Sequence, residues 1–228
     1  MKKFCAQLIL ASSLVVSAQA DTIAIIGTGS VAKALGPEFG AQGHTIVYGS
    51  RTPQSEKAEA LVSVTPGPAS AVFPPDAVVD ADMVVMAVPG DLVKEITTDL
   101  GDLSGKIIID PTNPLTGDWN TELRLSVDTS NARIIQDAAP GAFVVKAFST
   151  LNWRQMVEPD GDISILLAGD NEAAKKTVGQ LVSGMGLHPI DLGGVDNAHW
   201  IEGMTILWLN NRISDRANFE YYLRPVVQ

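Results

Sequence analysis

The residues best suited to chemistry lie in a glycine-containing turn directly after an apolar run. The run Ile23–Ile26 is typical of a buried parallel strand, and the turn reads Gly27-Thr28-Gly29-Ser30-Val31-Ala32. Gly27 allows a tight turn, Gly29 lets the backbone approach a pyrophosphate, and Ala32 permits close packing of helix on strand. The free N–H groups at the start of the following helix bind phosphate. Strand, turn and helix in this order predict a dinucleotide-binding site.

The end of the next expected strand indicates which dinucleotide is bound. Residues 45–48 form this strand, and Gly49-Ser50-Arg51 follow it. A site for NAD usually has Asp or Glu here, which accepts hydrogen bonds from the ribose 2′-hydroxyl. Ser50 and Arg51 instead offer a hydroxyl and a guanidinium, which suit a 2′-phosphate. The sequence therefore predicts NADP(H), with a solvent-facing Arg51 as the alternative.

The elements that must position these residues alternate between strand and helix. This pattern predicts an α/β fold, a doubly wound parallel sheet of the Rossmann NAD(P)-binding kind. A short C-terminal α/β extension and a terminal helix complete it. We expect further strands at 83–88, 106–110, 142–147, 163–168 and 188–191, and one short strand within the loop 64–75. Helices are expected at 53–62, 76–81, 91–100, 153–157, 171–185 and 196–216, with helical or irregular structure over 119–138.

In such a sheet, ligands bind outside the carboxyl ends of the strands. Several expected strands end in unusual loops, namely Val88-Pro89-Gly90, Pro111–Pro114 and Phe148-Ser149-Thr150. Their convergence at one edge would place Thr112, Asn113 and Ser149 near a nicotinamide. Lys146, at the end of its strand, is either an acid or phosphate ligand or a charge at the end of the sheet.

The first twenty residues have the three parts of a secretory signal peptide. Lys2 and Lys3 form a positive region, Phe4–Val16 is apolar, and Ala18-Gln19-Ala20 is a small-residue cleavage site. We therefore expect residues 1–20 to be removed, leaving 21–228 as one NADP(H)-binding domain with its C-terminal extension. The predicted location is periplasmic or secreted, without a membrane span after cleavage, and cytoplasmic if the leader is a start-site artefact.

Composition excludes several classes of function. The 228 residues carry a formal net charge of −10, which argues against binding to nucleic acid or an anionic membrane. The single cysteine, Cys5, lies in the leader, so residues 21–228 have no disulfide, thiol nucleophile or cysteine metal site. No hydrolase or zinc motif occurs among the three histidines. We predict no metal and no acid–base catalyst, with His199 as the best histidine candidate.

Two further groups of residues have open interpretations. Asp80, Asp82 and the other acidic residues are interpreted as solvated. Four large side chains either wall a flat ring or form core or dimer contacts. They are Trp153, in the expected helix 153–157, and Trp200, Met204 and Trp208, in the expected terminal helix. The chain thus allows a homodimer, while its expected partners are small-molecule cofactors.

Taken together, the chain resembles the F420-dependent NADP oxidoreductases and their NADPH-dependent flavin relatives, including the reductase domain of the STEAP metalloreductases. The matching segments cover nearly all of 21–228. They are IIGTGSVAKALG, GHTIVYGSR, KAEAL, ADMVVMAVP, IIIDPTNPL, VVKAFSTLN and LLAGDNEAAKKTVGQLVSGMGLHPIDLGGVDNAHWIEGM.

The resemblance implies roles for individual residues. It implies pyrophosphate binding by Thr28, Ser30 and Val31, and binding of the 2′-phosphate by Ser50, Arg51 and Lys57. It also implies that the nicotinamide is lined by Ala87, Val88 and Pro89, with Asn113 and Pro114 opposite. The candidate substrate-binding residues are Thr112, Lys146, Ser149 and Thr150.

The chain departs from the family pattern at two places. The stretch between Arg51 and Lys57 is longer than usual, and the typical Lys-Ala-Phe-Asn-Thr has Ser149 in place of Asn. The resemblance implies hydride transfer between NADP(H) and a flavin or deazaflavin, with F420, FMN or FAD as candidate partners. The alternatives are a non-catalytic NADP(H) binder or sensor and, ranked below it, a small-substrate NADP-dependent dehydrogenase, which would need a long all-helical domain.

Overall fold

The computed structural model describes residues 20–215 and residue 223. All of the predicted signal peptide except Ala20 lies outside these residues, so the leader and the location that it implies stay predictions. Within the described part of the chain, no helix is both long enough and apolar enough to cross a bilayer.

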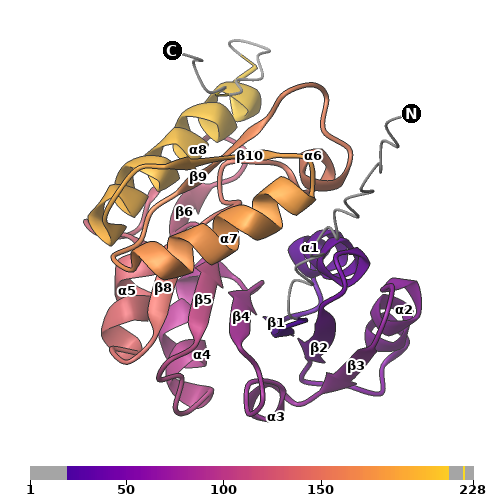
Figure 1. The fold of residues 1–228 in the computed structure, drawn as a ribbon. Helices are drawn as coiled ribbons and strands as arrows, with labels where there is room; N and C mark the ends of the chain where they lie inside the picture. Colours follow the sequence, from indigo (N-terminus) through magenta and orange to yellow (C-terminus); the bar gives the residue numbers. More distant parts are fainter. Residues whose placement is uncertain (1–19, 216–222, 224–228) are drawn as a thin grey trace, which may run out of the picture.

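A six-stranded parallel sheet forms the centre of the molecule (Figure 1). Its spatial order is β3-β2-β1-β4-β5-β8. This order reverses direction between β1 and β4, which is the topological switch point of a Rossmann fold. The predicted doubly wound sheet is therefore confirmed. The strands are β1 (Thr22–Ile26), β2 (Thr45–Gly49), β3 (Ala69–Val72), β4 (Met83–Met86), β5 (Ile107–Asp110) and β8 (Phe143–Lys146).

Helices cover both faces of this sheet because its strands are apolar on both sides. In β1, Ile23 and Ile25 face one core cluster, while Ala24 and Ile26 face the other. The first cluster is covered by α1 (Ser30–Ala41), α2 (Glu56–Val64), α6 (Trp153–Val157) and α7 (Glu172–Gly184). The second is covered by α3 (Pro74–Ala77), α4 (Val93–Asp99), α5 (Asn131–Ala138) and the start of α8 (Ala198–Ile213).

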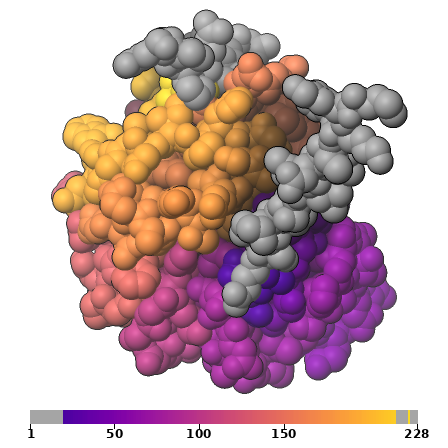
Figure 2. Space-filling model, viewed as in Figure 1, coloured from indigo at the N-terminus to yellow at the C-terminus, as the bar shows by residue number. Residues whose placement is uncertain are grey.

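The C-terminal extension has its own small sheet. Strands β9 (Ser164–Leu167) and β10 (His188–Asp191) pair in parallel, and α7 connects them. The extension joins the main sheet at Lys146, whose backbone N–H donates to the carbonyl of Ala168 at 2.8 Å. Figure 2 shows this orange and yellow segment lying directly against the N-terminal part of the chain. The predicted α/β extension is confirmed.

The prediction for the first half of the region 119–138 is wrong. Helical or irregular structure was expected there, and the structure has the second strand of a β-hairpin. Strands β6 (Leu115–Asp118) and β7 (Glu122–Leu125) pair antiparallel. The Asp118 side chain accepts from the backbone N–H of Asn120 and thereby closes the turn. Asn210 of α8 extends the pairing, since its side-chain amide exchanges two hydrogen bonds of 2.7 Å with the backbone of Leu123.

Two predicted helix starts are also wrong. Helix α2 begins at Glu56 rather than near Pro53, because the side chain of Ser55 accepts from the N–H of Ala58 and caps it. Helix α4 begins at Val93 rather than at Asp91, because Asp91 lies in the 3₁₀ turn η1 (Gly90–Leu92) that precedes it. A second such turn, η2 (Val195–Asn197), precedes α8.

Candidate functional site

The loops that follow β2, β1, β4, β5 and β8 contact one another in the order of the sheet. The Gly27 N–H donates to the carbonyl of Gly49 at 2.9 Å. A Cβ at Gly27 would overlap the carbonyl oxygen of Ala87, and a Cβ at Gly90 would overlap that of Asn113. The Asn113 side-chain amide in turn donates to the carbonyl of Ser149 at 2.9 Å. The structure thus brings together the strand-end loops singled out from the sequence.

The glycine turn leaves the start of α1 open. Gly27 has a φ of +111°, which glycine adopts without strain. Gly29 is the exposed N-cap of α1, no side chain caps the helix, and a Cβ at Gly29 would meet nothing within 4 Å. The first N–H groups of α1 are therefore accessible to an anion. Around them Thr28 and Val31 are half-buried, Ser30 is exposed and Ala32 is buried. This geometry fits a pyrophosphate.

The end of β2 offers a cation and no carboxylate. Ser50 is buried, and its hydroxyl accepts from the N–H of Thr52 at 3.1 Å. Arg51 is exposed, and its guanidinium has no ion pair or hydrogen bond within the described chain. Lys57 is an exposed residue in the first turn of α2. Both cations are free to meet a phosphate in solution.

The other side of the site is more enclosed. After β4, Ala87 and Val88 are half-buried and Pro89 is exposed; after β5, Thr112 and Pro114 are buried and Asn113 is half-buried. After β8, Ser149 is buried and Thr150 is half-buried. Asn113 Oδ1 and Ser149 Oγ are buried and have no hydrogen-bond partner in the described part of the molecule. Buried polar atoms normally have partners, so we interpret these two as candidate contacts for a polar ligand group or water.

Phe148 holds the β8 loop in an unusual conformation. Its φ is +63°, a value that costs a non-glycine residue roughly 1–3 kcal/mol. The side chain is buried, and its ring contacts the edge of Phe39 with 6.3 Å between the ring centroids. This packing holds the strained backbone in place, and the backbone directs Ser149, the next residue, toward Asn113 and α8.

The structure corrects the prediction for Lys146. Its side chain is fully buried, and the ammonium donates to Asp110 Oδ2 at 2.8 Å, to Glu202 Oε1 at 2.5 Å and to the carbonyl of Thr112. An ammonium has three N–H donors, so none remains for a ligand. Lys146 is therefore an internal ion-pair residue rather than a substrate contact.

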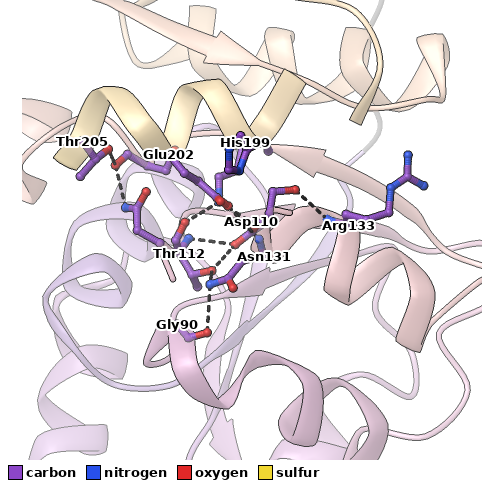
Figure 3. A network of polar contacts seen from close by, with 12 residues as sticks. Gly90, Asp110, Thr112, Asn131, Arg133, His199, Glu202 and Thr205 are labelled. Carbon is purple, nitrogen blue, oxygen red and sulfur yellow. Dashed lines mark hydrogen bonds and ion pairs between the residues drawn. The ribbon is translucent and has the colours of Figure 1, made fainter. Parts of the chain in front are cut away.

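Further hydrogen bonds extend this ion pair into a network (Figure 3). Asp110 Oδ1 accepts from the N–H and the hydroxyl of Thr112, and Glu202 Oε1 accepts from the N–H of Asn131. The Asn131 side chain donates to the carbonyl of Gly90 at 2.9 Å and to the Thr112 hydroxyl at 2.8 Å. We call these five residues the buried network: Asp110, Thr112, Asn131, Lys146 and Glu202.

The acidity of Glu202 is strongly perturbed. Burial raises the pKa of its carboxyl from 4.5 to about 7, and the Lys146 ammonium only partly offsets this effect. The nearby Asp110 carboxylate contributes to this rise in pKa. Glu202 Oε2 is buried without a partner among the described residues. The carboxyl thus changes its charge near neutral pH.

Sequence reasoning missed most of this network. Asp110 and Glu202 were interpreted as solvated acids, yet both side chains are fully buried. The available signals were an Asp that directly ends an apolar strand and an acid in an otherwise apolar helix. Trp200 is 71% exposed and so is not a core residue. His199 Nδ1 lies 2.5 Å from the carbonyl of Thr129, a contact that supports the protein backbone.

The fold is that of the Rossmann class, and similarities to known proteins support an NADP-dependent oxidoreductase. Residues 22–114 match the family described as "NADP oxidoreductase coenzyme F420-dependent". The predicted relationship to the F420-dependent NADP oxidoreductase family is thereby confirmed, and similarity to individual proteins extends it beyond this segment.

Three similar proteins illustrate the relationship. The F420-dependent NADP reductase of Methanothermobacter thermautotrophicus is 28% identical over 210 residues, 86% of this chain and 90% of that protein. The crystal structure of a protein provisionally assigned as an F420-dependent NADP reductase, from Arthrobacter sp. FB24, has a TM-score of 0.78 and 29% identity, over 89% of this chain and 99% of that one. Rat metalloreductase STEAP3 is 29% identical over 82% of this chain, which spans 37% of the length of that relative.

Proposed function

We propose that this chain transfers a hydride between NADP(H) and a flavin or deazaflavin cofactor such as F420, FMN or FAD. The observation that carries the proposal is the continuous series of contacts between the strand-end loops, from the cationic end of β2 to the buried polar atoms at Asn113 and Ser149. When bound, the nicotinamide and the flavin-type ring supply the redox chemistry. Similarity to an F420-dependent NADP reductase, and to a second protein provisionally assigned as one, supports this choice of partner.

Each part of the chain has a separate task in this proposal. The open amides of α1 bind the pyrophosphate, while Ser50, Arg51 and Lys57 hold the 2′-phosphate. Ala87, Val88 and Pro89 line one side of the nicotinamide, and Asn113 and Pro114 line the other. Thr112, Ser149 and Thr150 border the acceptor. The protein contributes alignment and exclusion of water, because hydride transfer requires no acid–base side chain in direct contact.

Arg51→Ala tests the cofactor assignment. Loss of a charge-assisted contact to the 2′-phosphate should weaken NADPH binding by roughly 1–3 kcal/mol and leave NADH binding nearly unchanged. Isothermal titration calorimetry with both dinucleotides measures this difference. Arg124→Ala is the matched control, since it removes the same charge from an exposed position on β7. Equal losses for NADPH and NADH in Arg51→Ala would reject the assignment.

Gly29→Ala tests the pyrophosphate site in a different way. The added Cβ meets nothing within 4 Å in the protein, so the chain should fold normally. The methyl group would stand at the open start of α1 and should weaken NADPH and NADH equally, by about 1–2 kcal/mol. Calorimetry measures the affinities and thermal unfolding checks the fold. Unchanged affinity for both dinucleotides would place the phosphates elsewhere.

A non-catalytic NADP(H) binder or sensor is the second candidate. Ser149, in place of the family's usual Asn, favours it because one amide is missing beside the acceptor. Stopped-flow mixing of the NADPH-loaded protein with FMN, FAD or F420 separates the two candidates. Oxidation of NADPH by any of the three supports the reductase. Tight NADPH binding without oxidation by any of them supports the sensor.

A further inference from the structure

The loops that surround the proposed hydride-transfer site are tied to α8 through buried side chains. Glu202 and Thr205 lie on the face of α8 that points toward the strand ends (Figure 3). Glu202 contacts Lys146 and Asn131, while the Thr205 hydroxyl donates to the carbonyl of Ser149 at 3.0 Å. Helix α8 therefore reaches the β8 loop directly and the β4 and β5 loops through its partners.

The buried network holds the β4 and β5 loops, and Asn113 and Thr205, outside the network, hold the β8 loop. Asn131 binds the Gly90 carbonyl after β4, Lys146 binds the Thr112 carbonyl after β5, and Asn113 and Thr205 both bind the Ser149 carbonyl after β8. Lys146 and Glu202 are completely buried, and Asn131 is almost so. Buried, hydrogen-bonded polar groups fix one arrangement more firmly than exposed ones do.

We propose that Lys146 and Glu202 are positioning residues for hydride transfer, because the buried network, together with Thr205 on the same helix as Glu202, fixes the β4, β5 and β8 loops around the nicotinamide and its acceptor. This inference rests on the proposed function for its catalytic part. Its structural part, the control of these loops by α8, stands independently. Small displacements of aligned reactants reduce transfer rates strongly, so the network acts on the rate through the loops and touches no reacting atom.

The dinucleotide's phosphates are held elsewhere. The open start of α1 and Arg51 belong to the other half of the site, and neither has a hydrogen bond to the buried network within the described chain. Loosening the network should therefore lower the hydride-transfer rate and leave NADPH affinity almost unchanged. A general loss of structure would lower both.

Glu202→Gln is the principal test, since glutamine keeps an oxygen for the N–H of Asn131 and removes the charge that pairs with Lys146. Thr205→Val is a milder second variant that removes only the bond to Ser149. Asp196→Asn is the control, because it breaks an exposed ion pair with Arg133 beside the same helix. We expect Glu202→Gln to lower the single-turnover rate from NADPH to FMN or F420 about tenfold, with the Kd for NADPH changed less than twofold.

Hydrogen exchange separates this inference from the proposed function. Amides in residues 90–92, 111–115 and 148–150 should exchange faster in Glu202→Gln than in the wild type or Asp196→Asn, and those of 148–150 should also do so in Thr205→Val. Unchanged exchange in these loops would overturn the inference. Faster exchange with an unchanged transfer rate would overturn the positioning role. Absence of transfer in the wild type would contradict the proposed function instead, and the exchange result would still decide the role of the network.

The pH dependence of the hydride-transfer rate is a further test, because it would not change if Glu202 had a purely structural role. The charged groups that act on Glu202 are Lys146 on β8 and Asp110 on β5. Of the other groups labelled in Figure 3, Arg133 on α5 pairs with Asp196, and His199 on α8 contacts the Thr129 carbonyl. The transfer rate of the wild type should change with pH near neutrality as Glu202 loses its proton. Glu202→Gln should flatten this change, while Asp196→Asn should retain it. Parallel profiles for all three proteins would contradict the proposal.

Discussion

Replacing Lys146 with methionine is expected to lower the free energy of unfolding by about 3–5 kcal/mol. The side chain is fully buried between the carboxylates of Asp110 and Glu202, at 2.8 and 2.5 Å. Methionine fills nearly the same volume but leaves two buried acids without a cation and the Thr112 carbonyl without a donor. Burying unpaired charge is far more costly than losing an exposed ion pair. Urea denaturation followed by circular dichroism measures the change.

The control for this substitution is Lys94→Met, which removes the same charge from an exposed position on α4. It should change stability by no more than about 0.5 kcal/mol. Combining Lys146→Met with Asp110→Asn and Glu202→Gln should recover part of the lost stability, because no uncompensated charge then remains. A loss below about 1 kcal/mol in Lys146→Met, similar to Lys94→Met, would contradict the ionised network.

The sheet and the glycine turn could be predicted from sequence because both depend on local patterns. The apolar runs that form β1, β4, β5 and β8 are buried on both faces, and buried parallel strands are continuous in hydrophobicity. Gly27 stands where a left-handed backbone meets another loop, a requirement that glycine alone satisfies. Convergence of the strand-end loops then follows from the parallel topology.

The hairpin and the buried network could not be predicted in the same way. The hairpin is completed by Asn210, 87 positions away from its partner Leu123, so its pairing is decided by tertiary contact. Lys146 and Glu202 are separated by 56 positions, and neither carries a local sign that it is paired. Charged residues are seldom fully buried unless they are paired, so a single sequence favours solvent exposure for each of them. Lys146 and Glu202 are buried because α8 packs on the strand ends, and this packing cannot be deduced from either residue alone.

The free energy of unfolding of the wild type is expected to fall as pH rises from about 5 to 8. This fall should exceed that of Glu202→Gln by roughly 3 kcal/mol. Burial raises the pKa of Glu202 from 4.5 to about 7 in the folded chain, so the folded state binds this proton more tightly than the unfolded state. The resulting stabilisation is fully present below the unfolded pKa and is lost as pH rises through the folded pKa. Denaturation midpoints measured at several pH values give the slope.

Two comparisons assign this slope to Glu202. Glu95→Gln removes an exposed carboxylate from α4 and should follow the wild type at every pH, whereas Glu202→Gln should lack the decline. All three proteins contain the same histidines, so any contribution from them cancels in the difference. If the wild type and Glu202→Gln kept a constant difference from pH 5 to 8, Glu202 would be ionised throughout this range, and Lys146 would outweigh the effect of burial on its carboxyl.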